Sequence, residues 1–186
     1  MDEPLRAVIF DLDGVLADSE PWWNKIDAKL LAEYGVDYHG EYHREVLGVS
    51  YRLAVEFYKT KFGISVPTEE LVKRRGEIAI GTSARPFLDR HHLTRFFDVV
   101  VAGDEIERGK PEPDIYLSTA EKLGLRPNEC LVVEDSLSGI AAAKAAKMRV
   151  AAIPDRRFVD PREYEKKADF LLNDLADIPA LVRSSD

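Results

Sequence analysis

The chain of 186 residues has little of several features that mark particular classes of protein. It has a single cysteine, Cys130, so no internal disulfide can form, which fits a reducing compartment. No stretch approaches the ~20 consecutive apolar residues that a membrane-spanning helix needs. The first residues are acidic and lead at once into an apolar run, so we expect no secretory signal. These absences predict a cytoplasmic protein that does not enter a membrane.

Basic residues are also in the minority, with 26 Lys and Arg against 34 Asp and Glu and a net charge of −8. A nucleic-acid partner would favour a basic face, so we expect none. The longest basic run, Lys73, Arg74 and Arg75, is typical of a solvated helix end. A hydrophobic content of 45% and a charged content of 32% indicate a folded globular protein, long enough for one domain with a smaller insertion.

Strand and helix signals alternate over most of the chain. Ala7–Phe10 is a short apolar run that predicts a buried strand, and residues 20–75 show helical periodicity instead. From Glu77 onward apolar strands alternate with helices, which predicts a parallel sheet covered on both faces. The predicted strands are 78–80, 99–103, 131–133, 150–153 and 170–172.

These signals predict an α/β fold with a doubly wound, mostly parallel sheet. Residues 1–16 and 76–186 would form a Rossmann-like core, and residues 17–75 an inserted α-helical cap. In such sheets ligands bind beyond the carboxyl ends of the strands. Polar side chains follow the predicted strands at this edge: Asp11, Asp13, Thr82, Lys110, Glu134 and Asp135. Converging carboxylates favour a hard cation such as Mg²⁺, and a hydroxyl and a lysine beside them suit phosphate oxygens.

Four segments carry a family resemblance. They are Asp11–Ser19 (DLDGVLADS), Ala79–Ser83 (AIGTS), Gly109–Asp114 (GKPEPD) and Val133–Ile140 (VEDSLSGI). Because these four segments occur in the order typical of the family, the chain resembles the haloacid dehalogenase superfamily. Within it, the chain resembles the β-phosphoglucomutase-like branch of capped sugar phosphatases and mutases. The resemblance implies a Mg²⁺-dependent phosphatase that hydrolyses a small phosphomonoester, expected to be a sugar phosphate, through an aspartyl-phosphate.

The resemblance also implies a role for each catalytic position. Asp11 resembles the nucleophile that becomes the aspartyl-phosphate, and Asp13 the general acid–base for the leaving alkoxide and the hydrolytic water. Thr82 resembles the hydroxyl that holds the transferring phosphoryl group, with the amide of Ser83 nearby. Lys110 resembles the lysine that balances the phosphate charge.

The same resemblance implies the metal ligands. Asp11, the carbonyl of Asp13 and Asp135 match the Mg²⁺ ligands, and Glu134 matches a ligand that binds directly or through water. The Lys110–Pro111 bond is expected to be cis, as in relatives.

Two cap residues are candidates for substrate binding. Arg52 would hold a distal phosphate or hydroxyl, or is a solvated helix residue. Trp23 would form a wall of the sugar pocket, or packs inside the cap. Trp23 stands where the mutase of this family has a catalytic histidine, which favours water as the phosphoryl acceptor.

Two alternatives remain open. A phosphosugar mutase would use the same core and return the phosphoryl group to the substrate. A metal- and phosphate-binding module without turnover belongs to another class. Gly103 and Gly109-Lys110 do not form a Walker-type phosphate loop, because the spacing differs and proline follows the lysine. The expected partner is a small phosphorylated metabolite, and the expected state is a monomer or weak homodimer.

The connection from the cap back to the core is unusually short. Only Lys73–Gly76 separates the last predicted cap helix from the predicted strand before Thr82, whereas relatives carry a further helix there. A missing core helix would expose apolar surface of the sheet. Either this deletion belongs to the protein, or the sequence joins segments that are separated in the full protein.

Overall fold

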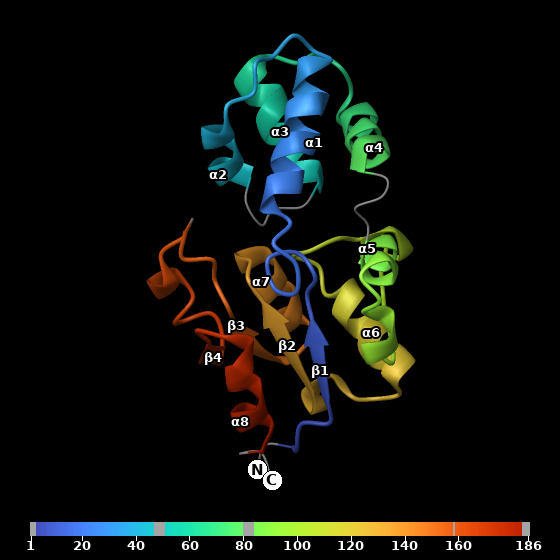
Figure 1. Cartoon of the computed structure of the whole chain (residues 1–186), viewed down its shortest axis with the longest axis vertical. Helices are drawn as coiled ribbons and strands as arrows, with labels where there is room; N and C mark the ends of the chain where they lie inside the picture. The colour runs from blue at the N-terminus through green and yellow to red at the C-terminus, as the bar shows by residue number, and fades with distance from the viewer. Residues whose placement is uncertain (1–2, 47–50, 80–83, 158, 184–186) are drawn as a thin grey trace.

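The computed structural model describes residues 3–46, 51–79, 84–157 and 159–183. It consists of an α/β core with a helical cap beyond one end of the sheet (Figure 1). The expected fold class is confirmed, because a parallel sheet is covered by helices and a helical segment follows the first strand.

Within the described residues, the core sheet has four parallel strands in the order β1-β2-β3-β4. They are β1 (Ala7–Phe10), β2 (Cys130–Glu134), β3 (Arg149–Ala152) and β4 (Phe170–Leu171). All five residues of β2 are buried, as is typical of a parallel strand with helices on both faces.

Helices cover the two faces of the sheet. On one face, Val132 packs with residues of α6 (Asp114–Leu123) and α7 (Leu137–Ala145). On the other face, Leu131 packs with residues of α8 (Ile178–Arg183). Successive residues of β2 point to opposite faces, so one strand anchors both layers.

The cap has its own hydrophobic core. Its helices are α1 (Glu20–Ala32), α2 (His43–Val46), α3 (Tyr51–Phe62) and α4 (Thr68–Ala79). The buried residues of this hydrophobic core are Leu30, Leu31, Val46, Ala54, Val55, Tyr58, Ile64 and Leu71. The cap is thus a packed unit that the chain enters from β1 and leaves through α4 (Figure 1).

The remaining elements connect these layers. Helix α5 (Ala84–Arg90) follows the cap. Short 3-10 helices lie at Gly40–Tyr42, Thr94–Phe96, Gly103–Glu105, Pro127–Glu129, Pro161–Glu163 and Leu175–Asp177. Among the described residues, no helix has both the length and the apolar character that crossing a membrane requires.

Two predicted strands are wrong. Ile78 and Ala79 are the last residues of α4, and residues 99–102 lie outside any strand. A strand parallel to β1 must begin at the end of the sheet away from the cap. The two residues 76 and 77 span about 7 Å, whereas β1 is about 13 Å long. The chain therefore cannot return to the start of the sheet, and residues 99–101 pair with no strand in the described part of the chain.

As a result, β1 lies at the edge of the sheet within the described part of the chain. Beside it is a cavity of about 1720 Å³, lined by β1, by residues 99–102 and by residues of the cap. The cavity continues to the carboxyl ends of β1 and β2, where it is lined by Asp11, Asp13 and Asp135.

Candidate active site

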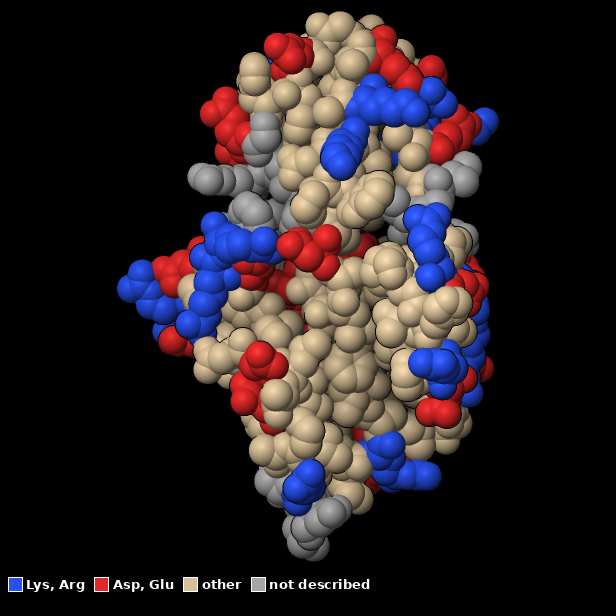
Figure 2. All heavy atoms as spheres, in the orientation of Figure 1, with Lys and Arg blue, Asp and Glu red and all other residues tan. Residues whose placement is uncertain are grey.

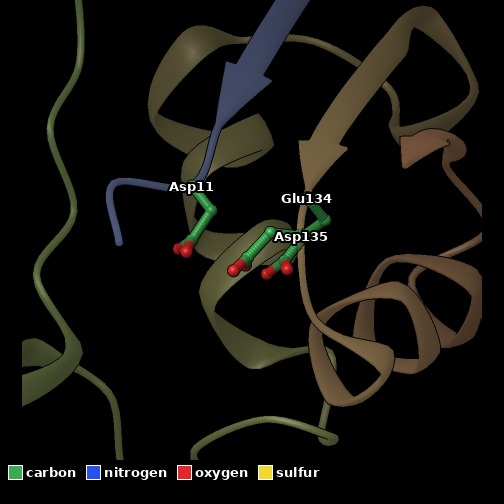
Figure 3. Close-up of side chains that lie close together, drawn as sticks. All are labelled: Asp11, Glu134 and Asp135. Carbon is green, nitrogen blue, oxygen red and sulfur yellow. The ribbon is translucent and has the colours of Figure 1, made fainter. Parts of the chain in front are cut away.

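Three carboxylates and an ammonium group meet at the carboxyl ends of β1 and β2. Asp11 directly follows β1, Glu134 ends β2 and Asp135 follows it. One carboxylate oxygen from each lies within 4.8 Å of those of the other two, and Figure 3 shows the three side chains converging. The amide of Asp11 donates to the carbonyl of Val133 at 3.0 Å, so the pairing of β1 with β2 continues into the site.

Lys110 joins this cluster from a distant segment. Its Nζ donates to Asp11 Oδ1 at 2.8 Å and to Glu134 Oε1. Tyr116, in the first turn of α6, donates from its hydroxyl to the same Glu134 oxygen at 2.7 Å. The Lys110 ammonium also lies 5.4 Å from the centre of the Tyr116 ring. One aromatic side chain thus contacts both members of the buried ion pair.

The second oxygen of Glu134 is held by the loop that starts α7. Ser136 donates to Glu134 Oε2 from its backbone amide and from its hydroxyl, both at 2.9 Å. The same hydroxyl accepts from the amide of Gly139 at 3.0 Å and caps α7. Glu134 has no exposed surface, and its hydrogen bonds explain how a carboxylate is tolerated there.

Two glycines let the backbone approach these carboxylates. Gly14 has φ +76°, and a Cβ there would lie 1.9 Å from Asp135 Oδ2. A Cβ on Gly139 would lie 1.7 Å from Glu134 Oε1. Any side chain at either position would displace an acidic group of the cluster.

Burial and charge act in opposite directions on these groups. Burial raises the pKa of Asp11 to about 6, although Lys110 partly offsets this. Burial also opposes the charged form of Lys110, but Asp11 and Glu134 outweigh it and raise the pKa of the lysine. The pKa of Glu134 is lowered, because Lys110, Ser136 and Tyr116 outweigh burial. The arrangement therefore holds a charged lysine against a charged glutamate.

The donor set fits a hard divalent cation. Asp11, Glu134 and Asp135 offer only oxygen atoms, which Mg²⁺ prefers. Asp13 adds a further carboxylate, which lines the same cavity and acts on Asp11 by charge repulsion. Close carboxylates repel one another unless a cation compensates them, and Lys110 supplies a single positive charge.

The other predicted site residues lie either outside the described residues or in the cap. Thr82 and Ser83 lie outside the described residues. Arg52 and Trp23 both line the cavity from the cap. Arg52 is exposed and pairs with Glu69 at 2.7 Å. The Lys110–Pro111 bond is cis, as expected.

Two residues near the cavity, Tyr116 and Arg75, were not predicted from the sequence. Tyr116 lies two residues after the GKPEPD segment, on the buried side of the first turn of α6. Arg75 is not at a solvated helix end but is only 5% exposed, which corrects the prediction for the basic run. Its signal was the spacing of Leu71, Arg75 and Ala79, which places all three on the buried face of α4.

The fold and the site define an enzyme with a capped α/β core and an acidic cluster at its strand ends. The sequence model of the haloacid dehalogenase-like hydrolase family matches residues 8–79 and 63–153, and the chain belongs to this family. The expected resemblance is thereby confirmed, as is the expected enzyme class, a phosphoric monoester hydrolase.

Curated relatives and solved structures agree with this assignment. The chain is 33% identical to the phosphorylated carbohydrates phosphatase of Thermotoga maritima, over 76% of this chain and 82% of the relative. It is 28% identical to hexitol phosphatase B of Escherichia coli K12, over 95% of each chain. The structure of CbbY from Rhodobacter sphaeroides in complex with phosphate has a TM-score of 0.71 at 23% identity, covering 94% and 96% of the two chains.

The comparisons also bear on the short connection after the cap. The alignment with hexitol phosphatase B runs over 218 positions, more than the 186 residues of this chain. The two matches of the family overlap over residues 63–79, so this segment aligns twice. Compared with hexitol phosphatase B, this chain is therefore shorter inside the aligned region.

Proposed function

We propose that this protein is a Mg²⁺-dependent phosphatase that hydrolyses a small phosphorylated metabolite of the sugar phosphate class, through an aspartyl-phosphate on Asp11. Relatives named as phosphatases of phosphorylated carbohydrates and hexitols support the substrate class. The acidic cluster at the ends of β1 and β2 supports the chemistry.

The observation that carries the proposal is the position of Lys110 between Asp11 and Glu134. An anionic nucleophile attacks an anionic phosphoryl group only when nearby cations screen their repulsion. Lys110 is held in its charged form beside the nucleophile, and the buried Glu134 fixes it there. We propose that Glu134 orients Lys110 and contacts the metal directly or through water.

In the proposed reaction, a carboxylate oxygen of Asp11 bonds to phosphorus while the phosphorus–oxygen bond to the leaving group breaks. Asp13 gives its proton to the leaving oxygen and later takes one from the water that attacks the aspartyl-phosphate. That attack releases inorganic phosphate and restores Asp11. Thr82 and Ser83 are proposed to hold the phosphoryl oxygens.

Asp11, Asp135 and the carbonyl of Asp13 would hold the Mg²⁺ ion. When bound, it would withdraw charge from the phosphoryl oxygens and compensate the clustered carboxylates. Lys110, which pairs with Glu134, would supply a further positive charge for the phosphoryl group.

A panel of phosphomonoesters tests the proposal, with phosphate release measured for the parent and for Asp13→Asn. We expect Mg²⁺-dependent release by the parent, and a rate roughly 10²–10⁴-fold lower for Asp13→Asn. Asp37→Asn is the matched control, since Asp37 is an exposed aspartate of the cap whose side chain is 94% exposed.

Three outcomes would contradict the proposal. A parent rate in Asp13→Asn would reject the acid–base role. A requirement for a sugar bisphosphate would favour the mutase. No phosphate release from any member of the panel would favour a binding module without turnover.

A further inference from the structure

The cap contains a buried ion pair that the proposed reaction does not use. Asp27 of α1 has no exposed surface, and Arg75 of α4 is 5% exposed. The guanidinium is bidentate, with Nε 2.7 Å from Asp27 Oδ1 and Nη2 3.1 Å from Oδ2. The Tyr58 hydroxyl donates to Asp27 Oδ2 at 2.7 Å, so the carboxylate accepts three hydrogen bonds.

Stability alone does not account for such a pair. Removing two charges from water is costly, and apolar residues of similar volume often replace a buried ion pair without loss of stability. The rest of the cap core is apolar and aromatic, so such a replacement would suit its surroundings.

The pair lies beneath an aromatic wall of the cavity. The Arg75 guanidinium is 5.0 Å from the centre of the Trp23 ring. Trp23 is in the first turn of α1, and Arg75 is near the end of α4. These are the two ends of the cap that face the core (Figure 1). Both residues line the cavity that also contains Asp11 and Lys110.

We propose that Asp27 and Arg75 are positioning residues that hold the Trp23 indole as a wall for the carbon portion of the substrate. This inference rests on the proposed function. An indole offers a large, rigid apolar surface, which packs well against the C–H groups of a sugar or hexitol. Asp27 fixes Arg75, and Arg75 fixes the orientation of the ring through its cation–π contact.

The ion pairs also determine the charge of this wall. Every cap cation that lines the cavity within the described residues faces a carboxylate. The pairs are Arg52 with Glu69, Lys73 with Glu77 and Arg75 with Asp27. The wall therefore fits a phosphomonoester whose carbon portion is uncharged better than a bisphosphate. Figure 2 shows charged side chains of both signs beside the indentation between cap and core.

The direct test replaces the buried polar cluster by apolar residues, in the triple variant Asp27→Leu, Tyr58→Phe, Arg75→Met. We expect the thermal midpoint to be kept, because the three side chains that hydrogen-bond to one another in this cluster are replaced together. KM for the best hexose or hexitol monophosphate of the panel should rise about tenfold, because the indole loses its orienting contact. Acetyl phosphate has no carbon ring to pack on Trp23, so its kcat and KM should stay within about twofold.

Arg74→Gln is the matched control. Arg74 is the neighbouring arginine of α4 and pairs with Glu33 at the cap surface, with Nη2 2.6 Å from Oε1. This variant removes the surface ion pairs of Arg74 with Glu33 and Glu77 and leaves Asp27 and Arg75 in place, so we expect both KM values to be unchanged.

A second measurement follows Trp23 without any turnover. The chain has two tryptophans, so Trp22→Phe leaves Trp23 as the single emitter. Acrylamide should quench it more strongly in the triple variant than in the parent background. Unchanged quenching, or equal changes in KM for the sugar phosphate and acetyl phosphate, would overturn the inference. If the parent releases no phosphate at all, the proposed function fails, while quenching still decides the placement of Trp23.

Discussion

The two sides of β1 differ, although similar apolar runs occur on both. On one side, β2, β3 and β4 pair in parallel, and β2 and most of β3 are buried between two helix layers. On the other side, residues 99–101 are all valine and thus more β-branched than β2, but they pair with no strand in the described structure. The comparison shows that an apolar run becomes a parallel strand only where a crossover connection brings it to the right end of the sheet.

The candidate site lies on the side of β1 that pairs with β2. Asp11, Glu134 and Asp135 come from β1 and β2, and Lys110 reaches them from the segment before α6. The side of β1 that faces residues 99–101 contributes the cavity. We expect the two sides to differ also in the free energy that their residues contribute to folding.

The largest loss of stability is expected from Gly139→Ala in α7, which packs on the β2 side of β1. A Cβ there would lie 1.7 Å from Glu134 Oε1, so the buried carboxylate must move away from Lys110. We expect unfolding in denaturant to show a loss of about 3 kcal/mol. Phosphatase activity should fall as well, because Lys110 loses its support.

Gly76→Ala is the matched substitution in α4, the cap helix that leads back to the core. Gly76 lies inside α4, and a Cβ there meets no atom within 4 Å. We expect a gain of about 0.5–1 kcal/mol in the free energy of unfolding, since alanine favours a helix over glycine. A loss of stability would contradict the helical assignment of this segment.

A pair of valines compares packing on the two sides. Val132 in β2 has no exposed surface, whereas Val100 is partly exposed and lines the cavity. We expect Val132→Ala to cost about 2–3 kcal/mol and Val100→Ala less than about 1 kcal/mol, both by denaturant unfolding. Equal costs would mean that residues 99–101 are packed as tightly as a core strand.

The smallest effect concerns two carboxylates, one on each side. Hydrogen bonds from the backbone and side chain of Arg126 lower the pKa of Glu129 to about 2. Lys122 and Arg85 lower the pKa of Glu105 to about 2. Each carboxylate therefore stabilises the fold above the ordinary glutamate pKa, and this contribution is lost as the pH falls toward 2.

Unfolding at pH 7 and pH 3 measures this contribution. Glu129→Gln and Glu105→Gln should both destabilise the protein at pH 7, and their cost should shrink at pH 3. Glu129 should show the larger cost at pH 7, because it is buried whereas Glu105 is exposed. A cost that grows as the pH falls would contradict the assigned pKa direction.

Much of this structure could be predicted from the sequence. The apolar runs at Ala7–Phe10 and 131–133 predicted two strands, and the polar residues after them predicted the acidic cluster. These features follow from local pattern together with one rule, that the ends of parallel strands share an edge.

The errors came from features that depend on the rest of the chain. Ile78 and Ala79 have the composition of a strand, but the two residues before them cannot cross the sheet. Arg75 stands in a basic run, and its partner Asp27 lies on another helix, so the spacing within α4 could indicate its burial but not its ion pair. The hydrogen bond from Tyr116 to Glu134 likewise joins residues whose proximity only the fold determines.

The most direct test of the account is the covalent intermediate itself. The parent enzyme would be mixed with a turned-over sugar phosphate and Mg²⁺, quenched rapidly in acid, digested and analysed by peptide mass spectrometry. The account predicts one added phosphoryl group, on the peptide that contains Asp11, and none after Asp11→Asn. Steady phosphate release with the phosphoryl group on another residue, or continued turnover by Asp11→Asn, would contradict it.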